Sequence, residues 1–367
     1  MSKKALVAFL GNPFFDTRVT NLFSSLNSLQ IEVKVIGFDW ISSRVKSEQN
    51  IIVTELDRKS SFGFYFSFMK ILYQHLKENN ADYYFAEDVY TLPLISLFAK
   101  SRKKKLFYNS RELYPFIAGL SKKKLIQFLL AKVEKLFIKS PDVIFVTGDL
   151  DAEFLGNYYR IKNILVLRNL PKLIEIKPTD ELRSSLKINE NEKIILYQGV
   201  VFKGRGIQLV INAIKNLSNV HFVVLGDGNQ KVEYQKYASD LGVGNHVHFL
   251  GSISQEKLSA FTSSADLGVA LIENISTSYY YALPGKLFEY IMAEVPVLCS
   301  DLPQMKKIVR EFNVGESIPI ESEEIIQRTI KKILDDDKRL KIFKENCRLA
   351  KRQLNWDSEF KKLIPYL

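Results

Sequence analysis

Short apolar runs alternate with longer amphipathic segments through the first half of the chain. Runs such as ALVAFL at 5–10 and VIFV at 143–146 are typical of buried strands. Segments such as 18–29 place apolar residues at helical spacing. This alternation favours a parallel sheet covered by helices on both faces. The same pattern predicts further strands at 33–38, 51–55, 83–86, 104–107 and 164–167, and helices at 62–78, 90–101, 122–139 and 150–158.

The alternation breaks at residues 168–192 and then resumes. RNLP at 168–171 predicts a turn, and the polar stretch after it, which includes Pro178, predicts an interdomain linker over 171–192. Beyond it we expect strands at IILYQG, HFVVLG, VHFLG and LGVALI, helices near 206–217, 230–240 and 255–264, and a helical tail from 322.

The fold class expected from this pattern is α/β, with two doubly wound, Rossmann-like domains facing a central cleft. The predicted domains are residues 1–170 and 193–350, and a C-terminal helix at 351–367 is expected to pack back on the first domain. Ligands in such sheets bind beyond the carboxyl ends of the strands.

Composition narrows the class of protein. A chain of 367 residues is long enough for two domains. No apolar run approaches the roughly 18–20 residues that a membrane span needs. ALVAFL follows two lysines but lacks a small-residue cleavage site, so we expect a first strand there and no signal peptide. Cys299 and Cys347 offer no disulfide framework or metal spacing, which fits a reducing cytoplasm, and His246 and His248 fit a strand edge.

The positive charge is concentrated in the first half of the chain. The formal net charge is +11. Residues 1–183 hold 28 Lys and Arg against 19 Asp and Glu, whereas residues 184–367 hold 24 against 22. A basic first domain suggests an anionic partner, such as a membrane surface or a phosphorylated acceptor, although the charge could serve solubility alone. No aromatic–basic recognition module accompanies it, so no nucleic acid is expected as a partner.

The segment YALPGKLFEYIMAEVPVLCSD at 281–301 carries the most informative motif. A loop at 283–285 precedes helical spacing at 286–293 and a short buried strand at 297–299. A helix that begins after a glycine loop presents unpaired N–H groups and a positive dipole end, which suits a pyrophosphate. Glu289 lies one turn inside this helix, where its carboxylate could accept hydrogen bonds from two vicinal hydroxyl groups.

Two glycine loops follow predicted strands in the second half. YQGVVFKGRGI at 197–207 places Lys203 and Arg205 beside exposed N–H groups, an arrangement suited to a diphosphate leaving group. LGDGN at 225–229 is another strand-end loop, and VHFLG at 247–251 completes a further strand. A solvated basic turn and an ordinary glycine turn are the alternatives.

Three strand-end blocks of the first half carry further candidate binding residues: GNPFFDTRV at 11–19, EDVYTLP at 87–93 and YNSRELY at 108–114. A glycine at a strand-to-helix turn lets a ligand approach the backbone closely. Arg18 could meet an anionic acceptor or simply solvate the helix start. The acidic pair at 87–88 could face the cleft or favour the start of a helix.

In this order, the blocks resemble those of family 4 glycosyltransferases, of glycosyl transferase group 1 type, which have the GT-B fold. The resemblance runs from about residue 5 to 367. It implies a retaining hexosyltransferase that moves a sugar from a nucleoside diphosphate donor, of UDP or GDP, to a glycan or lipid-linked acceptor in cell-surface polysaccharide or glycolipid synthesis. It also implies no cofactor and no metal. The Asp-x-Asp spacing at 149–151 begins a helix, where acidic residues are expected anyway.

The resemblance also assigns roles to residues. Arg205, Lys203 and Arg111 would act at the reaction centre, and Glu289 would hold the nucleotide ribose. Donor contacts are expected at Gly11, Gly199, Arg205, Gly226, Gly228, Leu250, Leu283, Pro284, Gly285, Lys286, Leu287 and Glu289. Acceptor contacts are expected at Asn12, Arg18, Asp88, Arg111 and Glu112.

The chain departs from the family pattern at four positions. Asn109 stands where an Asp is usual and Arg111 where a His is usual, and a guanidinium cannot exchange a proton near pH 7. Val200 replaces an Arg, and Tyr281 replaces a Glu. Two alternatives therefore stay open: a catalytically silent GT-B partner subunit or glycan-binding protein, and a sugar-nucleotide epimerase of similar fold.

Two segments of the first half could rest on a membrane. SKKKLIQFLLAKVEKLFIK at 121–139 is a basic amphipathic helix, and 62–73 is unusually aromatic. Each lysine near an anionic bilayer contributes about 1 kcal/mol. Together with a lipid-linked acceptor, this would give a cytoplasmic protein that is peripheral on the inner face of the membrane. The alternative is that both helices turn their apolar sides to the core of the first domain.

Overall fold

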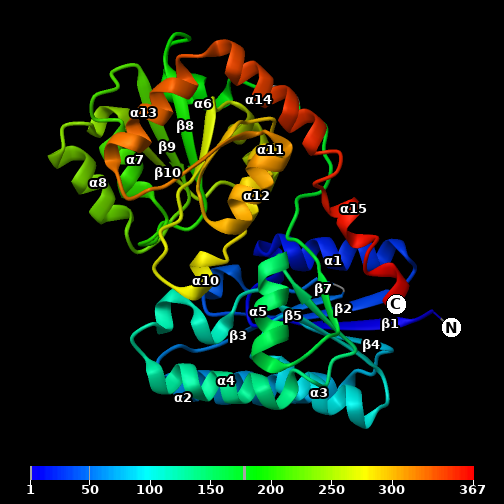
Figure 1. The fold of residues 1–367 in the computed structure, drawn as a ribbon. Helices are drawn as coiled ribbons and strands as arrows, with labels where there is room; N and C mark the ends of the chain where they lie inside the picture. Colours follow the sequence, from blue (N-terminus) through cyan, green and yellow to red (C-terminus); the bar gives the residue numbers. More distant parts are fainter. Residues whose placement is uncertain (1, 49, 177–178) are drawn as a thin grey trace. The chain divides into compact units, whose positions relative to one another are not determined.

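The computed structural model describes residues 2–48, 50–176 and 179–367, and the chain divides into two compact units (Figure 1). Unit 1 comprises Met1–Asn169 with Glu359–Leu367, and unit 2 comprises Leu170–Ser358. Pro178, part of the expected linker, lies outside the described residues.

Unit 1 is built on a seven-stranded parallel sheet in the order β3-β2-β1-β4-β5-β6-β7. The order reverses between β1 and β4, which makes the unit doubly wound and creates a switch point where ligands bind in such sheets. Its strands and helices are β1 Lys4–Ala8, α1 Thr17–Ser28, β2 Glu32–Asp39, β3 Ile51–Glu55, α2 Ser61–Glu78, β4 Tyr83–Ala86, α3 Leu92–Ser101, β5 Lys105–Ser110, α4 Lys124–Phe137, β6 Val143–Val146, α5 Asp149–Tyr159 and β7 Ile164–Val166.

The apolar runs of unit 1 form strands because helices cover both faces of the sheet. All four residues of β4 and of β6 are buried. Helix α1 begins where the Asp16 side chain accepts a hydrogen bond from Val19 N. Helix α2 begins in the same way at Ser60, which caps Gly63 N. Every strand and helix predicted before residue 168 overlaps one of these described elements.

Unit 2 is a second doubly wound unit, with a six-stranded parallel sheet in the order β10-β9-β8-β11-β12-β13. The order reverses between β8 and β11. The short helix α10, the helix α12 and the edge strand β13 were not predicted. The strands and helices of unit 2 are α6 Glu181–Leu186, β8 Lys193–Gln198, α7 Ile207–Ala213, β9 Val220–Leu225, α8 Lys231–Asp240, β10 Val247–Gly251, α9 Gln255–Ser263, β11 Leu267–Ala270, α10 Thr277–Tyr280, α11 Gly285–Met292, β12 Val297–Ser300, α12 Pro303–Phe312, β13 Gly315–Ile318, α13 Glu323–Leu334 and α14 Asp337–Ala350.

The core of unit 2 lies in two layers, one on each face of its sheet. Successive strand residues point to opposite faces. Ile194 and Leu196 of β8 therefore join one buried cluster, whereas Ile195 and Tyr197 join the other. The expected α/β class with two parallel, Rossmann-like sheets is confirmed.

The segment 171–192, expected as a linker, contains α6, and Leu182 of this helix is fully buried in the core of unit 2. The last residues of the chain belong to unit 1, after α15 (Trp356–Phe360). Lys105 Nζ donates to the carbonyl of Tyr366 at 2.8 Å. Among the described helices, none is long and apolar enough to cross a membrane.

Candidate functional site

Two glycine turns lie against each other at the carboxyl ends of β8 and β9. Gly199 N donates to Leu225 O at 2.9 Å. Gly226 has φ +142°, and a Cβ there would lie 2.0 Å from Gly199 O. A Cβ at Gly228 would similarly lie 2.2 Å from Val201 O. Backbone packs on backbone here, so only glycine fits and the loop edges stay open to a ligand.

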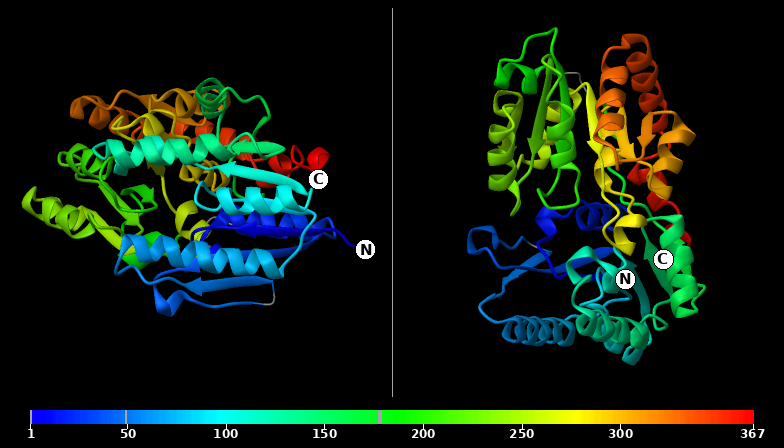
Figure 2. Two further views of the ribbon diagram at one scale, coloured as in Figure 1. Left: turned by 90° about the horizontal axis from the view of Figure 1, so that it is seen from below. Right: turned by 60° about the vertical axis from the view of Figure 1, so that its left-hand side comes forward.

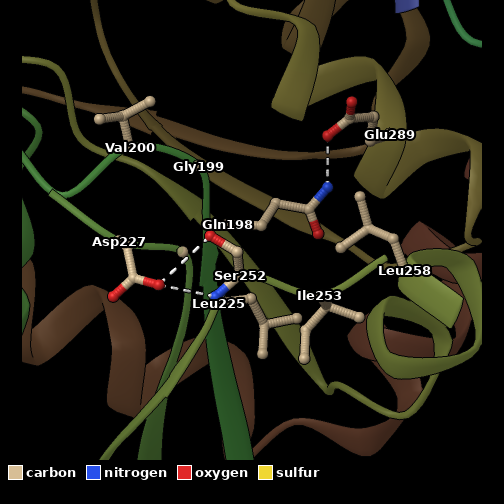
Figure 3. A pocket seen from close by; sticks show the side chains of 10 residues that line it. Gln198, Gly199, Val200, Leu225, Asp227, Ser252, Ile253, Leu258 and Glu289 are labelled. Carbon is tan, nitrogen blue, oxygen red and sulfur yellow. Dashed lines mark hydrogen bonds between the residues drawn. The ribbon is translucent and has the colours of Figure 1, made fainter. Parts of the chain in front are cut away.

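A pocket of about 270 Å³ opens beside these turns (Figure 3). It brings together the ends of β8, β9 and β10 with helices α9 and α11, all within unit 2. One side is apolar, and the other carries carboxylate, amide and hydroxyl groups. The lining residues are Gln198, Gly199, Val200, Leu225, Gly226, Asp227, Ser252, Ile253, Leu258 and Glu289.

The carboxylate of Glu289 is held by a short relay of side chains. Gln198 Nε2 donates to Glu289 Oε2 (Figure 3), and Thr262 Oγ1 donates to Gln198 Oε1 at 2.8 Å. Burial raises the pKa of Glu289, while the Gln198 hydrogen bond and the charge of Lys286 act in the opposite direction. Because Gln198 and Thr262 are buried, they fix where the carboxylate points.

Lys286 lies beside the glycine turn at 199, and the charge of Arg205 reaches it. Lys286 Nζ lies 3.5 Å from the centroid of the Tyr197 ring, and a Cβ on Gly199 would lie 3.4 Å from this ammonium. Arg205 lies over the Tyr279 ring, with 4.7 Å from Cζ to the centroid. The pKa of Lys286 is lowered well below its ordinary value by burial and by the charge of Arg205. An anion between these cations would relieve that cost.

Asp227 and Ser252 line the pocket across from Glu289 (Figure 3). Asp227 Oδ2 accepts from Ser252 N at 3.0 Å and from Ser252 Oγ at 3.3 Å (Figure 3). Lys231 Nζ donates to Asp227 Oδ1 at 2.6 Å and lowers the pKa of this carboxyl group. The arrangement ties the turn after β9 to the turn after β10.

Helix α11 begins at Gly285, and its N-cap residue, Pro284, gives the first turn no side-chain cap. The first N–H groups of α11 and the side chain of Lys286 are thus at one end of the helix. Leu287 is fully buried, and Leu283 and Leu250 pack against the same core.

Lys203, which was expected at the reaction centre with Arg205, is exposed. Gly11, expected at the donor, lies in unit 1, where its carbonyl accepts from Phe38 N at 2.9 Å.

In unit 1, Arg111 is fixed between two carboxylates at the ends of β1, β4 and β5. Its Nη1 donates to Asp16 at 2.6 Å and its Nη2 to Glu87 at 2.7 Å. Asn109 Nδ2 also donates to Glu87, at 2.8 Å. The guanidinium of Arg111 also stacks on the Phe9 ring, with 4.2 Å from Cζ to the ring centroid. The two carboxylates raise the pKa of Arg111 against the effect of burial, so it is a permanent cation.

The other predicted acceptor residues have different surroundings. Asp88 accepts from Leu10 N and Thr91 N, and burial raises its pKa. Asn12 Oδ1 accepts a hydrogen bond from Phe14 N, and Asn12 Nδ2 donates to Asp39 and to Arg44 O. The carbonyl and the amino group of this side chain therefore both serve the local fold. Glu112 is exposed.

Arg18 keeps a buried Nη1 without a hydrogen-bond partner, and burial together with the charge of Arg111 lowers its pKa.

Sequence reasoning included Gln198, Leu225 and Asp227 of the pocket wall only as members of the blocks at 197–207 and 225–229, without a predicted contact, and it did not name three others: Ser252, Ile253 and Leu258. Gln198 is the last residue of β8 and lies directly before a glycine, a position where a polar side chain reaches the ligand edge of a parallel sheet. The other three have no signal in sequence, because only tertiary packing brings α9 and the turn after β10 to this edge. Among the described residues, no group of three or more His, Cys, Asp or Glu is placed to hold a metal ion.

Solved structures share this two-unit architecture over nearly the whole chain. Sucrose-phosphate synthase from Thermosynechococcus elongatus matches with a TM-score of 0.80 at 15% identity, covering 99% of this chain and 98% of that one. Anabaena HepE in complex with UDP-glucose matches with a TM-score of 0.76 at 14% identity, covering 99% of both chains. The architecture is that of GT-B glycosyltransferases, which confirms the expected fold.

Residues 178–350, all within unit 2, match the family described as Glycosyl transferases group 1. Among curated relatives, the lipopolysaccharide 1,2-N-acetylglucosaminetransferase of Salmonella typhimurium is 28% identical over 194 residues, 49% of each chain. The chain thus spans about half the length of the first curated relatives it matches. The resemblance drawn from the sequence motifs is confirmed.

Proposed function

We propose that the protein is a retaining glycosyltransferase that moves a hexose from a nucleoside diphosphate sugar, of UDP or GDP, to a glycan or lipid-linked acceptor. Its place would be cell-surface polysaccharide or glycolipid synthesis at the cytoplasmic face of a membrane. The relative that acts in lipopolysaccharide synthesis supports the acceptor class.

One observation carries the proposal: the carboxylate of Glu289 lines the pocket of unit 2, and the ammonium of Lys286 lies beside the glycine turn at 199 within reach of the charge of Arg205. Glu289 lines the pocket, oriented by Gln198. Lys286 lies beside Gly199 and is electrostatically coupled to Arg205. A nucleoside diphosphate offers two ribose hydroxyls to the carboxylate and two phosphates to the cations.

The chemistry follows from this placement. The acceptor oxygen bonds to the anomeric carbon as the bond from that carbon to the diphosphate oxygen breaks, and the acceptor proton leaves with the diphosphate. Negative charge grows on the diphosphate, where Arg205, Lys286 and the first N–H groups of α11 stabilise it. Lys203, whose side chain is exposed, belongs to the same loop as Arg205 and would add to this positive charge. Fixed cations of this kind make a metal ion unnecessary.

The acceptor would bind in unit 1, near the carboxyl ends of β1, β4 and β5. Arg111 is paired with Asp16 and Glu87, so it positions charge and does not transfer a proton. Arg18 retains unsatisfied donor capacity and suits an anionic group of the acceptor.

The test is calorimetric titration with UDP, GDP, ADP and CDP. We expect one nucleotide to bind, and Glu289→Ala to weaken it at least about tenfold, the equivalent of one lost hydrogen bond to a charged group. Glu294→Ala is the matched control, since this glutamate lies just beyond the same helix and pairs with Lys351 instead. If no nucleotide binds at millimolar concentration, the donor site is wrong.

Two outcomes separate the alternatives. A catalytically silent partner would bind the nucleotide without turning over the sugar nucleotide, and the locked state of Arg111 is the observation that favours it. An epimerase would convert the sugar nucleotide without an acceptor. Transfer of labelled sugar to a lipid-linked acceptor would exclude both.

A further inference from the structure

Helix α4 of unit 1 presents its apolar side to the outside of the protein. Leu125 is 70% exposed, Phe128 is 56%, Leu129 is 53% and Leu136 is 74%. An ordinary surface helix turns this side to the core. The alternative in which α4 turns its apolar side to the core is therefore not met by these side chains, and an exposed apolar patch of this kind marks an interaction surface.

A polar residue attaches α4 to the rest of unit 1. Glu134 is fully buried, and its two oxygens accept hydrogen bonds of 2.6 Å from Tyr108 and Tyr159. Ile138, directly after the helix, is also fully buried. Because this anchor fixes the rotation of the helix, the outward position of the apolar side is built into the fold.

Lysines surround the apolar side. The segment 121–139 contains one acidic residue, Glu134, which is buried, so the outward charge of this segment is entirely positive. All of its lysines are exposed: Lys122, Lys123, Lys124, Lys132, Lys135 and Lys139.

The neighbouring helices continue the same surface. Figure 2 (left) shows α4, α3 and α2 side by side, and contacts join α3 to each of the other two. Leu97 of α3 is 56% exposed. On α2, Phe62 and Phe66 are exposed and stack on each other at 6.2 Å.

We propose that α4, with α2 and α3 beside it, is a docking surface for an anionic lipid bilayer. The apolar side chains would enter the boundary between headgroups and acyl chains while the lysines contact lipid phosphates. A protein partner would need acidic residues around an apolar groove, whereas a bilayer offers both features over any area. The surface rests on its own geometry and does not depend on the proposed sugar transfer.

The test is sedimentation of the full chain with vesicles of phosphatidylcholine alone, or mixed with phosphatidylglycerol. We expect binding to the mixed vesicles only, weakened by salt. Each lysine at the surface contributes about fivefold to binding. Lys132→Glu with Lys135→Glu should therefore reduce binding by more than about 20-fold. Phe128→Gln with Leu129→Gln should reduce it by at least about tenfold.

Matched controls lie on α14 of unit 2. Ile342 and Leu349 are 54% and 50% exposed, so Ile342→Gln with Leu349→Gln removes the same kind of surface elsewhere. Lys338→Glu with Lys341→Glu repeats the charge reversal at the same spacing. Both controls should bind vesicles as the wild type does. Circular dichroism checks that each variant is folded.

Three outcomes of the vesicle assay would overturn the proposal: no binding to anionic vesicles, equal loss in the α14 controls, or unchanged binding in both α4 variants. A dimer in light scattering that the Phe128 and Leu129 changes dissociate, without vesicle binding, would make a second copy the occupant and also overturn it. Nucleotide titration of the same variants should be unchanged, so failure here and failure of the donor site are distinguishable.

Discussion

Replacing Arg111 with Met tests whether the charge cluster of unit 1 is a fixed structural element. The substitution keeps much of the side-chain volume and the contact with Phe9, and it removes only the guanidinium. Two carboxylates then lose their partner: Glu87, which is fully buried, and Asp16, whose side chain is 23% exposed. Asn109 still donates to Glu87 after the change.

The size of the effect follows from these exposures. Removing one partner of a buried ion pair costs about 3–5 kcal/mol, because an uncompensated charge remains. Asp16 can gain water and Glu87 keeps one hydrogen bond, so we expect the lower end, about 3 kcal/mol. Adding Glu87→Gln removes the stranded charge and should recover about 1–2 kcal/mol of the free energy of unfolding.

Hydrogen exchange measures this free energy in unit 1 alone. Amides of β4 and β5 should exchange about 100-fold faster in Arg111→Met, while those of unit 2 keep their rates. A loss below about 1 kcal/mol would mean that water screens the cluster, and the reasoning would be wrong.

The loss of stability at low pH gives a second test of the same cluster. Although burial opposes it, the charges of Arg111 and Arg18 hold the pKa of Asp16 below its ordinary value. Asp16 therefore stabilises unit 1 above pH 3.8, and this contribution is lost as pH falls through the lowered pKa. The loss should be smaller in Arg111→Met.

Three further changes test unit 2. Lys286→Met should weaken a nucleoside diphosphate about tenfold and the corresponding monophosphate less, by calorimetry, whereas Lys286→Arg should retain most of the affinity; equal losses for both nucleotides would contradict a role at the diphosphate. Gly226→Ala should destabilise unit 2 by more than about 1 kcal/mol in hydrogen exchange, because the new Cβ meets Gly199 O; unchanged exchange would mean that the turn relaxes freely. Burial and two neighbouring histidine rings lower the pKa of His248 below 6.5, so unit 2 should lose stability as pH falls from 7 through that lowered pKa. In urea titrations, His248→Phe should make the free energy of unfolding depend less on pH over this range; an unchanged pH dependence would assign the loss to other groups.

Much of the fold was predictable because its signals are local. Strands such as β6 are short apolar runs between turns, and α1 begins at a capping Asp16. The β-α alternation then limits the topology to doubly wound sheets. The unpredicted β13 has only four residues with a mixed pattern, whereas α12 did carry a local signal, Pro303 at its start and Met305, Ile308 and Val309 at helical spacing. The segment 171–192 looked polar although Leu182 is buried.

For the candidate site, sequence spacing indicated the backbone features, whereas tertiary structure decided the side-chain partners. The glycine turns and the start of α11 could be predicted, since they depend on neighbouring residues. The partner of Glu289 could not, because Gln198 lies 91 positions away and meets it only when β8 and α11 pack together. The same holds for Lys286, whose neighbour Arg205 comes from a different loop.

By itself, then, the sequence determined the two parallel α/β sheets, the glycine turns at their strand ends and the resemblance to a family, because these depend on local periodicity and on short motifs. Only the tertiary structure decided that Arg111 is locked between Asp16 and Glu87, and that α4 turns its apolar side outward. An amphipathic pattern states that a helix has two sides. Which side is buried depends on distant partners, here Tyr108 and Tyr159, whose hydroxyl groups hold the single acidic residue of α4.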